Sequence, residues 1–231
     1  MAMNLLALDT STEYCSCALW RNGEVLARGE LAGQRHSEIL LPMIDGLLKE
    51  AGLTLKQLDG IAFGAGPGSF TGIRIACSVV QGLALGADLP VVPVCTLEAL
   101  AEQAGADGVV AALDARLDEV YVAYYRRVGE IWQPRFGPTL CSIADTPSLN
   151  EPGWAGIGSG FLMKDGALAR HLGLQGAWVN GACYPQAGAI AKLGAAALAR
   201  GEGRDAADAQ PVYLRNKVAL TIEERAQRKR A

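Results

Sequence analysis

The chain has little charge, few aromatic residues and only two histidines. Of its 231 residues, 19% are charged and 6% are aromatic, and the net charge at pH 7 is −3. Basic residues gather only near the end, in the charged tail 216–231, which we interpret as a solvated helix end. Because neutralised phosphates supply most of the affinity for nucleic acid, this composition argues against nucleic-acid binding by the chain alone.

The sequence also lacks standard metal and catalytic motifs. Neither a G-x-S-x-G nucleophile turn nor an H-E-x-x-H metal motif occurs. Two histidines, His36 and His171, do not complete a zinc site with cysteines at these spacings. We therefore expect no metal, no other cofactor and no disulfide framework, with free thiols in a reducing cytoplasm at Cys15, Cys17, Cys77, Cys95, Cys141 and Cys183.

Signals for export or membrane insertion are missing as well. The start has no cationic leader, and Asp9 interrupts its short apolar run. No stretch approaches the roughly 18 uninterrupted apolar residues of a membrane helix. Half of the residues are hydrophobic, which is enough for a full core. We expect a cytoplasmic protein with no membrane association.

The first hundred residues predict three strands followed by alternating helices and strands. An apolar strand ends at Asp9, an alternating strand spans 14–20, and Asn22-Gly23 predicts a hairpin turn to a strand at 25–30. Helices are expected at 39–51, 70–85 and 97–104, and strands at 60–63 and 91–95. Pro42 must then lie close to the first turn of its helix, and Gly52 ends that helix. This order is that of a ribonuclease-H-like unit.

A second half begins near Val109 and resembles the first. Both LLALDTSTEYCSCALW and VVAALDARLDEVYVAYYR contain an apolar strand, an aspartate, a polar turn and an alternating strand led by a tyrosine. The self-similarity fits a duplicated unit. We predict an α/β protein with domains at 1–105 and 106–215, in which a last helix at 186–200 can pack back on the first domain.

Asp9, at the end of the first strand, has two interpretations. In actin-like ATPases an acidic residue here positions a metal-bound nucleotide, whereas elsewhere an aspartate organises a turn through its own backbone hydrogen bonds. Active families carry D-x-G-T, since glycine lets amides approach phosphates. Ser11 takes the glycine position here, and the matching stretch 114–117 has no glycine. We expect a vestigial nucleotide cleft at Asp9, Thr10, Ser11, Asp114 and Gly158, and an ATP-dependent kinase or ATPase is the alternative function.

The loop GAGPGSFTG resembles a phosphate-binding loop without matching a standard one. No lysine occurs between Lys56 and Lys164, which excludes a P-loop, and Ser69 stands where G-x-G-x-x-G needs its third glycine. An anion could still meet the helix N-terminus here. Taken alone, the loop favours a tight turn with Ser69 as the helix N-cap.

Two helices carry apolar residues beyond one face. Leu41 on the helix at 39–51, and Phe70 and Ile73 on the helix at 70–85, lie outside the main apolar stripes. An exposed apolar patch on two helices marks a partner surface. Periodicity alone does not distinguish such a surface from core, so both interpretations stay open.

Five ordered motifs together resemble the TsaB family, also called YeaZ. They are L-x-L-D-T-S (6–11), R-H-S-E-x-L-L-P (35–42), G-x-G-P-G-S-F-T-G-I-R-I (64–75), L-D-A-R-x-x-E-V-Y (113–121) and P-V-Y-L-R (211–215). The resemblance covers the chain from about Asn4 to Arg215, and GPGSFTGIR is its most specific part.

The resemblance implies two ribonuclease-H-like domains of the actin/Hsp70/sugar-kinase superfamily. It also implies a cytoplasmic role in tRNA threonylcarbamoyladenosine formation, in which the transferase is the paralogue TsaD and the ATPase TsaE joins them. Such proteins pair with TsaD, or with themselves, through the two helices above, and meet tRNA only through the complex. The implied interface residues are His36, Ile39, Leu40, Met43, Ile44, Leu47, Phe70, Gly72, Ile73, Ala76, Cys77 and Val80.

A comparison with TsaD predicts that this chain is not the enzyme. TsaD-like sequences carry a metal motif resembling N-H-x-E-G-H just after the fifth strand, and the corresponding stretch here is 95–100. Thr96 and Leu100 occupy the two histidine positions, and neither can replace an imidazole ligand. We expect a non-catalytic scaffold that activates TsaD. A metallopeptidase is a third interpretation, which a tightly bound metal would favour.

Overall fold

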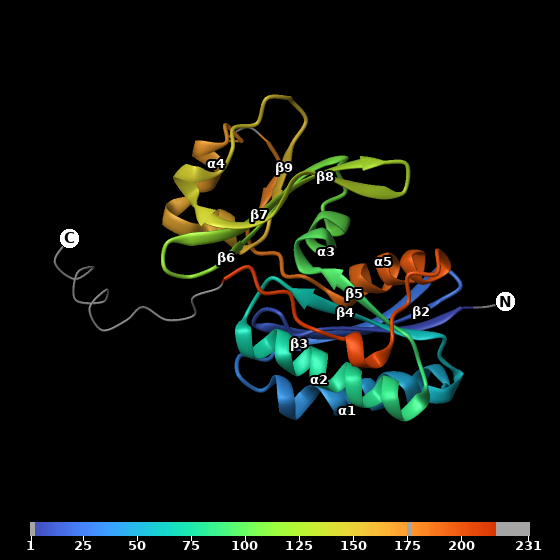
Figure 1. The fold of residues 1–231 in the computed structure, drawn as a ribbon. Helices are drawn as coiled ribbons and strands as arrows, with labels where there is room; N and C mark the ends of the chain where they lie inside the picture. The colour runs from blue at the N-terminus through green and yellow to red at the C-terminus, as the bar shows by residue number, and fades with distance from the viewer. Residues whose placement is uncertain (1–2, 175–176, 216–231) are drawn as a thin grey trace.

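A computed structural model of the chain describes residues 3–174 and 177–215, and places them in two lobes, each built on a five-stranded sheet (Figure 1). In the first sheet, β1 to β3 are antiparallel neighbours, and β4 and β5 run parallel to β1. The strand order is β3-β2-β1-β4-β5. The strands are β1 (Asn4–Asp9), β2 (Tyr14–Arg21), β3 (Glu24–Leu31), β4 (Gly60–Gly66) and β5 (Val91–Cys95).

The second sheet repeats the topology of the first. Read from its hairpin edge, its order is β8-β7-β6-β9-β10, again with three antiparallel strands followed by two parallel ones. The duplicated α/β unit expected from the sequence is confirmed at the level of strand order. The strands are β6 (Gly108–Asp114), β7 (Glu119–Val128), β8 (Ile131–Ser142), β9 (Ala155–Ile157) and β10 (Val179–Asn180).

Helices cover both faces of the first sheet. α1 (His36–Ala51) and α2 (Phe70–Ala87) pack on one face, and α5 (Ala187–Ala199) packs on the other, although it comes from the end of the described chain (Figure 1). Gly194 lets α5 approach closely, since a Cβ there would lie 2.4 Å from Cβ of Ala62. α3 (Thr96–Gln103) packs on the second sheet, whose far face carries α4 (Ala167–His171). We propose the domain division at about residue 105, with α5 packed back on the first sheet.

The apolar run of β1 fits a strand that is buried on both faces. Leu6 and Leu8 face α1 and α2, whereas Leu5 and Ala7 face α5. Side chains alternate across a strand, so a strand with helices on both sides needs an uninterrupted apolar run. The run ends at Asp9, which places this carboxyl group at the carboxyl edge of the sheet, beside the cleft described below.

Three local predictions can be checked directly. Asn22 and Gly23 both have positive φ, as the predicted hairpin turn requires, and Gly52 ends α1 in the left-handed conformation.

The prediction for Pro42 was wrong. Because α1 begins at His36, Pro42 lies inside the helix and not in its first turn. Its position on the exposed side lets water satisfy the backbone group that proline leaves unpaired. The tail 216–231 lies outside the described residues.

Candidate functional site

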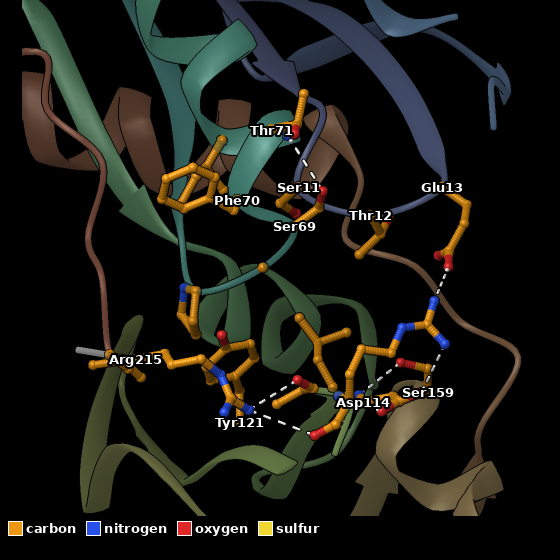
Figure 2. Close-up of a pocket in the computed structure, with 18 of the residues that line it drawn as sticks. Ser11, Thr12, Glu13, Ser69, Phe70, Thr71, Asp114, Tyr121, Ser159 and Arg215 are labelled. Atoms are coloured by element: carbon orange, nitrogen blue, oxygen red, sulfur yellow. Dashed lines mark hydrogen bonds and ion pairs between the residues drawn. The ribbon is translucent and has the colours of Figure 1, made fainter. Parts of the chain in front are cut away.

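A cleft of about 850 Å³ opens between the two lobes. Figure 2 shows that it lies between the turn after β1 and the start of α2 on one side, and the turn after β6 on the other. Ser11, Ser69, Asp114 and Ser159 supply polar groups to its lining, and Phe70 supplies an aromatic ring. The two strands that end here, β1 and β6, are the equivalent strands of the duplicated units. The cleft is therefore the place where a nucleotide would be expected in this fold.

Asp9 lies behind the cleft and does not line it. Its buried carboxylate accepts hydrogen bonds at Oδ1 from the Ser11 backbone N (3.0 Å) and from Ser11 Oγ (2.8 Å). Oδ2 has no hydrogen-bond partner among the described residues and lies against Gly64, where a Cβ would be 1.8 Å away. Desolvation raises the pKa of Asp9 to about 7, and the hydrogen bonds from Ser11 oppose that rise. In this arrangement Asp9 organises the turn.

The loop before α2 packs directly on that same turn. Ser69 N donates to Ser11 O at 2.7 Å, and Thr10 Oγ1 donates to Gly72 O at 2.7 Å. Gly68 and Gly72 are required by this packing, since a Cβ on either would lie within 2.5 Å of a backbone oxygen of the turn. Ser69 caps α2 as predicted, accepting from Gly72 N at 3.3 Å. The glycines of the loop therefore serve backbone-to-backbone packing.

The turn after β6 is held in an unusual conformation. Arg116, Leu117 and Asp118 all have positive φ, at 64°, 57° and 63°, which costs free energy for residues other than glycine. Asp114 stabilises the turn by accepting from Arg116 N at 2.7 Å, and its own N–H donates to Ser159 Oγ at 3.0 Å. Gly158, with φ of 101°, is packed against Ala112 O and does not line the cleft.

The chain itself spans the mouth of the cleft in two places. Arg116 forms an ion pair with Glu13 across it, with Nη2 and Oε1 3.3 Å apart (Figure 2). Residues 211–215, here called the strap, run from one lobe to the other. Val212 N donates to Ala65 O at 2.7 Å, while Arg215 donates to Ala115 O at 3.0 Å and pairs with Glu119 at 2.7 Å. The sequence motif P-V-Y-L-R marked these residues without revealing that they bridge the lobes.

The positions that would correspond to metal ligands in TsaD are structural here. Thr96 is buried and donates its hydroxyl to Pro67 O, and Leu100 is buried in the core of the second lobe. Among the described residues, no three His, Cys, Asp or Glu side chains gather closely enough to hold a metal ion. Burial raises the pKa of the Cys15 and Cys17 thiols to about 12, and all six cysteines are free.

Most of the expected interface residues lie inside the first lobe. Of the twelve, Ile39 and Met43 are partly buried and Phe70 is exposed; the other nine are buried. The apolar stripe of each helix packs on the first sheet, with Ala76 in that core, and Gly72 lets the start of α2 approach the turn after β1. The assignment of these twelve residues to a partner interface stays a prediction. The nine buried residues are His36, Leu40, Ile44, Leu47, Gly72, Ile73, Ala76, Cys77 and Val80.

The exposed sides of the two helices form a different surface, here called the α1–α2 face. Leu85 is 79% exposed and Leu41 is 49% exposed, and Arg74 is the single charged residue in the whole of α2. By length and composition α2 is apolar enough to cross a membrane, a property that buried helices share, yet only a third of it is buried. The face comprises Leu41, Pro42, Asp45, Gly46, Thr71, Arg74, Ser78, Gly82, Leu85 and Gly86.

Comparison with known proteins identifies the family. A protein named TsaB from Haemophilus influenzae is 38% identical over 94% of this chain and 95% of its own length. The TsaB of Escherichia coli is equally similar, with 94% of this chain and 96% of that protein covered. The chain belongs to the TsaB family. Its resemblance to TsaB in five motifs is thereby confirmed.

Structural and family comparisons agree with membership of the TsaB family. YeaZ from Pseudomonas aeruginosa superposes with a TM-score of 0.85 at 39% identity, covering 92% of this chain and all of that one. A family model for TsaD, a tRNA N6-adenosine threonylcarbamoyltransferase, matches residues 28–177. The fold is that of the actin/Hsp70/sugar-kinase superfamily, and the TsaB family belongs to tRNA threonylcarbamoyladenosine biosynthesis.

Proposed function

We propose that the chain is a non-catalytic subunit that activates TsaD by forming a heterodimer with it through the α1–α2 face. The observation that carries the proposal is α2, a long apolar helix with one charge whose outward side is open to solvent. On the α1–α2 face Leu41 and Leu85 expose apolar side chains to water. Because exposed apolar surface is unfavourable by roughly 25 cal/mol per Å², burial of these two side chains favours a partner that covers the face.

Small residues on the same face suit a helical partner. Ser78, Gly82 and Gly86 lie along the exposed side of α2, and Gly46 lies on that of α1. A Cβ built on any of the three glycines meets nothing within 4 Å, so their size serves no packing inside the lobe. Small side chains let a second pair of helices approach closely, and a stable pair covers about 800 Å² on each partner.

Three features support a role without catalysis. Asp9 is buried beneath its own turn, and residues of the chain span the mouth of the cleft. Thr96 and Leu100 replace the histidines of the TsaD motif with side chains that are fixed in the core. We therefore assign substrate chemistry to TsaD. The net charge of −3 argues against tRNA binding by the chain alone, so we propose that it meets tRNA within the complex. We further propose that the chain is cytoplasmic, meets TsaE in the same complex, and pairs with itself through the α1–α2 face when alone.

Reconstitution tests the proposal. The assay measures modified adenosine in tRNA after incubation with purified TsaD, TsaE, threonylcarbamoyl-adenylate and ATP. It is run with and without the chain. We expect product only when the chain is present, and none from the chain alone. Equal activity without it would overturn the assignment and favour a nucleotide-dependent enzyme, which tight ATP binding by the isolated chain would then reveal.

A matched pair of variants locates the interface. Gly82→Arg adds a large charged side chain to the α1–α2 face, whereas Gly137→Arg adds one to β8 of the second lobe. Both glycines are exposed, have no positive φ and leave open space for a Cβ. Only Gly82→Arg should abolish heterodimer formation in size-exclusion chromatography, with both variants retaining the thermal stability of the parent.

A further inference from the structure

Arg74, the single charge of α2, is held between two aromatic rings. Its guanidinium carbon lies 3.8 Å from the ring centre of Phe70 and 5.6 Å from that of Tyr213. Its Nε donates to the Tyr213 hydroxyl at 2.6 Å. The rings themselves are 5.4 Å apart at an angle of 35°. Tyr213 comes from the strap, 139 residues beyond Arg74, so two distant segments build one cluster at the amino end of α2.

The cluster fixes Arg74 but leaves part of its hydrogen-bonding capacity free. An arginine has five N–H donors in a planar fork, and among the described residues only the one on Nε finds an acceptor. The terminal nitrogens make no hydrogen bond or ion pair with any residue in the described ranges 3–174 and 177–215. Phe70 and Tyr213 are 39% and 41% exposed, so the cluster lies at the surface and not in the core.

The free terminal nitrogens suit a carboxylate. A guanidinium fork matches a carboxylate with two parallel hydrogen bonds, and stacking on aromatic rings removes the conformational entropy that a free arginine would lose on binding. Arginine and tyrosine are also the residues that contribute most to protein–protein affinity when they are held in place. A phosphate backbone would call for several cations together, and α2 offers one.

We infer that Phe70, Arg74 and Tyr213 form an anchor that binds a carboxylate of the subunit covering the α1–α2 face. The inference rests on the proposed function, because Arg74 is one of the residues of that face and lies between Thr71 and Ser78 on the exposed side of α2. It adds a residue of the strap to the pairing surface. The strap is itself fixed by the hydrogen bond from Val212 N to Ala65 O, so Tyr213 is placed before a partner arrives.

Affinity measurements with intact TsaD test the anchor. Arg74→Glu should weaken heterodimer formation by about 30-fold or more, since breaking one side of a covered charge pair costs at least ~2 kcal/mol. Arg74→Lys keeps the charge without the planar fork, and Tyr213→Phe keeps the ring without the hydroxyl, so both should lose several-fold. Arg135→Glu, an exposed arginine on β8, is the control with unchanged affinity. Thermal melts establish that each variant is folded.

Double-mutant cycles then identify the acceptor. Each exposed acidic residue of TsaD is changed to alanine, and the affinity of each variant is measured for the parent chain and for Arg74→Ala. One acidic residue should show a coupling energy with Arg74 and none with the control residue Arg135. If Gly82→Arg abolishes pairing and Arg74→Glu pairs normally, the anchor is wrong and the interface stands. If the parent chain does not bind TsaD, the proposed function itself fails. Normal pairing with lost tRNA modification in Arg74→Glu would place the arginine against tRNA and would also overturn the anchor.

Discussion

Glu13 and Arg116 join two turns that are equivalent in the duplicated fold. The Oε1 atom of Glu13, after β1, lies 3.3 Å from Nη2 of Arg116, after β6. In a nucleotide-dependent relative these two turns would face the phosphates from opposite sides. Here a carboxylate from one turn meets a guanidinium from the other, so the lobes contact each other directly at the mouth of the cleft.

The ion pair should contribute little to stability, because both side chains are more than half exposed. The positive φ of Arg116 should affect the free energy of unfolding more than the ion pair does. Arg116→Gly removes the ion pair and relieves the backbone, so its free energy of unfolding should stay within about 1 kcal/mol of the parent. Arg116→Val retains the unfavourable φ and adds a branched side chain, and should cost about 1–3 kcal/mol. Urea denaturation distinguishes these outcomes, and equal losses in both variants would contradict the strain argument.

Stability should fall as pH rises through the titration of Asp9. Burial raises the pKa of this acid from 3.8 to about 7, so the folded state holds a proton that the unfolded state releases. The protonated group's contribution to the free energy of unfolding is fully present below about pH 4. Between pH 4 and pH 7 that free energy should fall by an amount on the order of 3–4 kcal/mol. Asp9→Asn should flatten this dependence between pH 4 and 7 in chemical denaturation. An unchanged slope in the variant would show that other groups control it.

Activation of TsaD should not depend on the charge of Asp9. Because the carboxyl group is buried behind the first turn and away from the cleft lining, Asp9→Asn should retain partner-dependent tRNA modification. The assay is the reconstituted reaction at a pH where the variant is folded. A collapse of activity in a variant that still forms the heterodimer would contradict the scaffold role.

Two glycine-to-alanine changes should act in opposite directions. Gly64→Ala would place a Cβ 1.8 Å from Asp9 Oδ2, inside a buried site that cannot yield, and should cost at least ~3 kcal/mol. Gly82→Ala lies on the open side of α2 and should stabilise the isolated chain by about 0.5–1 kcal/mol. Thermal melts of the two variants give the signs directly. By the same geometry Gly72→Arg should lower the free energy of unfolding, since even a Cβ at this position would lie 1.9 Å from Thr10 O.

The strap should link the two lobes. Arg215 is largely buried, donates to Ala115 O and pairs with Glu119 at 2.7 Å. Arg215→Ala leaves that carbonyl and carboxylate without their partner and should lower the free energy of unfolding by about 1–3 kcal/mol. Arg204→Ala, an exposed arginine outside the strap, serves as the comparison. Hydrogen exchange should rise in the turn 115–118 of the first variant and not in the second.

Much of the fold could be predicted because local patterns and tertiary packing agree in it. The run from Leu5 to Leu8 is apolar throughout because helices cover both sides of β1, and Asn22-Gly23 forms the turn that its residues favour. Pro42 departs from its expected position because tertiary packing of α1 outweighs the local cost of a proline.

The site was harder to predict, since periodicity does not say what covers an apolar residue. In sequence, Gly72 and Ala76 form a stripe of small residues that fits a partner or the interior of the lobe equally well. In the structure both are buried inside the first lobe. The cluster of Arg74 with Tyr213 and the contacts of Arg215 join residues about 100 or more apart in sequence. No local pattern signals such contacts, and a single sequence does not reveal them.

The open side of α2 has a consequence for how the protein must be supplied in a living cell. Without a partner, the α1–α2 face leaves Leu85 and Leu41 in water, at 79% and 49% exposure, and exposed apolar side chains are what chaperones and proteases detect. A partner that binds only the folded chain raises the population of folded chain by mass action and lowers that of unfolded chain. On the proposed function, the amount of usable subunit would then follow the amount of TsaD, and synthesis in matched quantities would protect both.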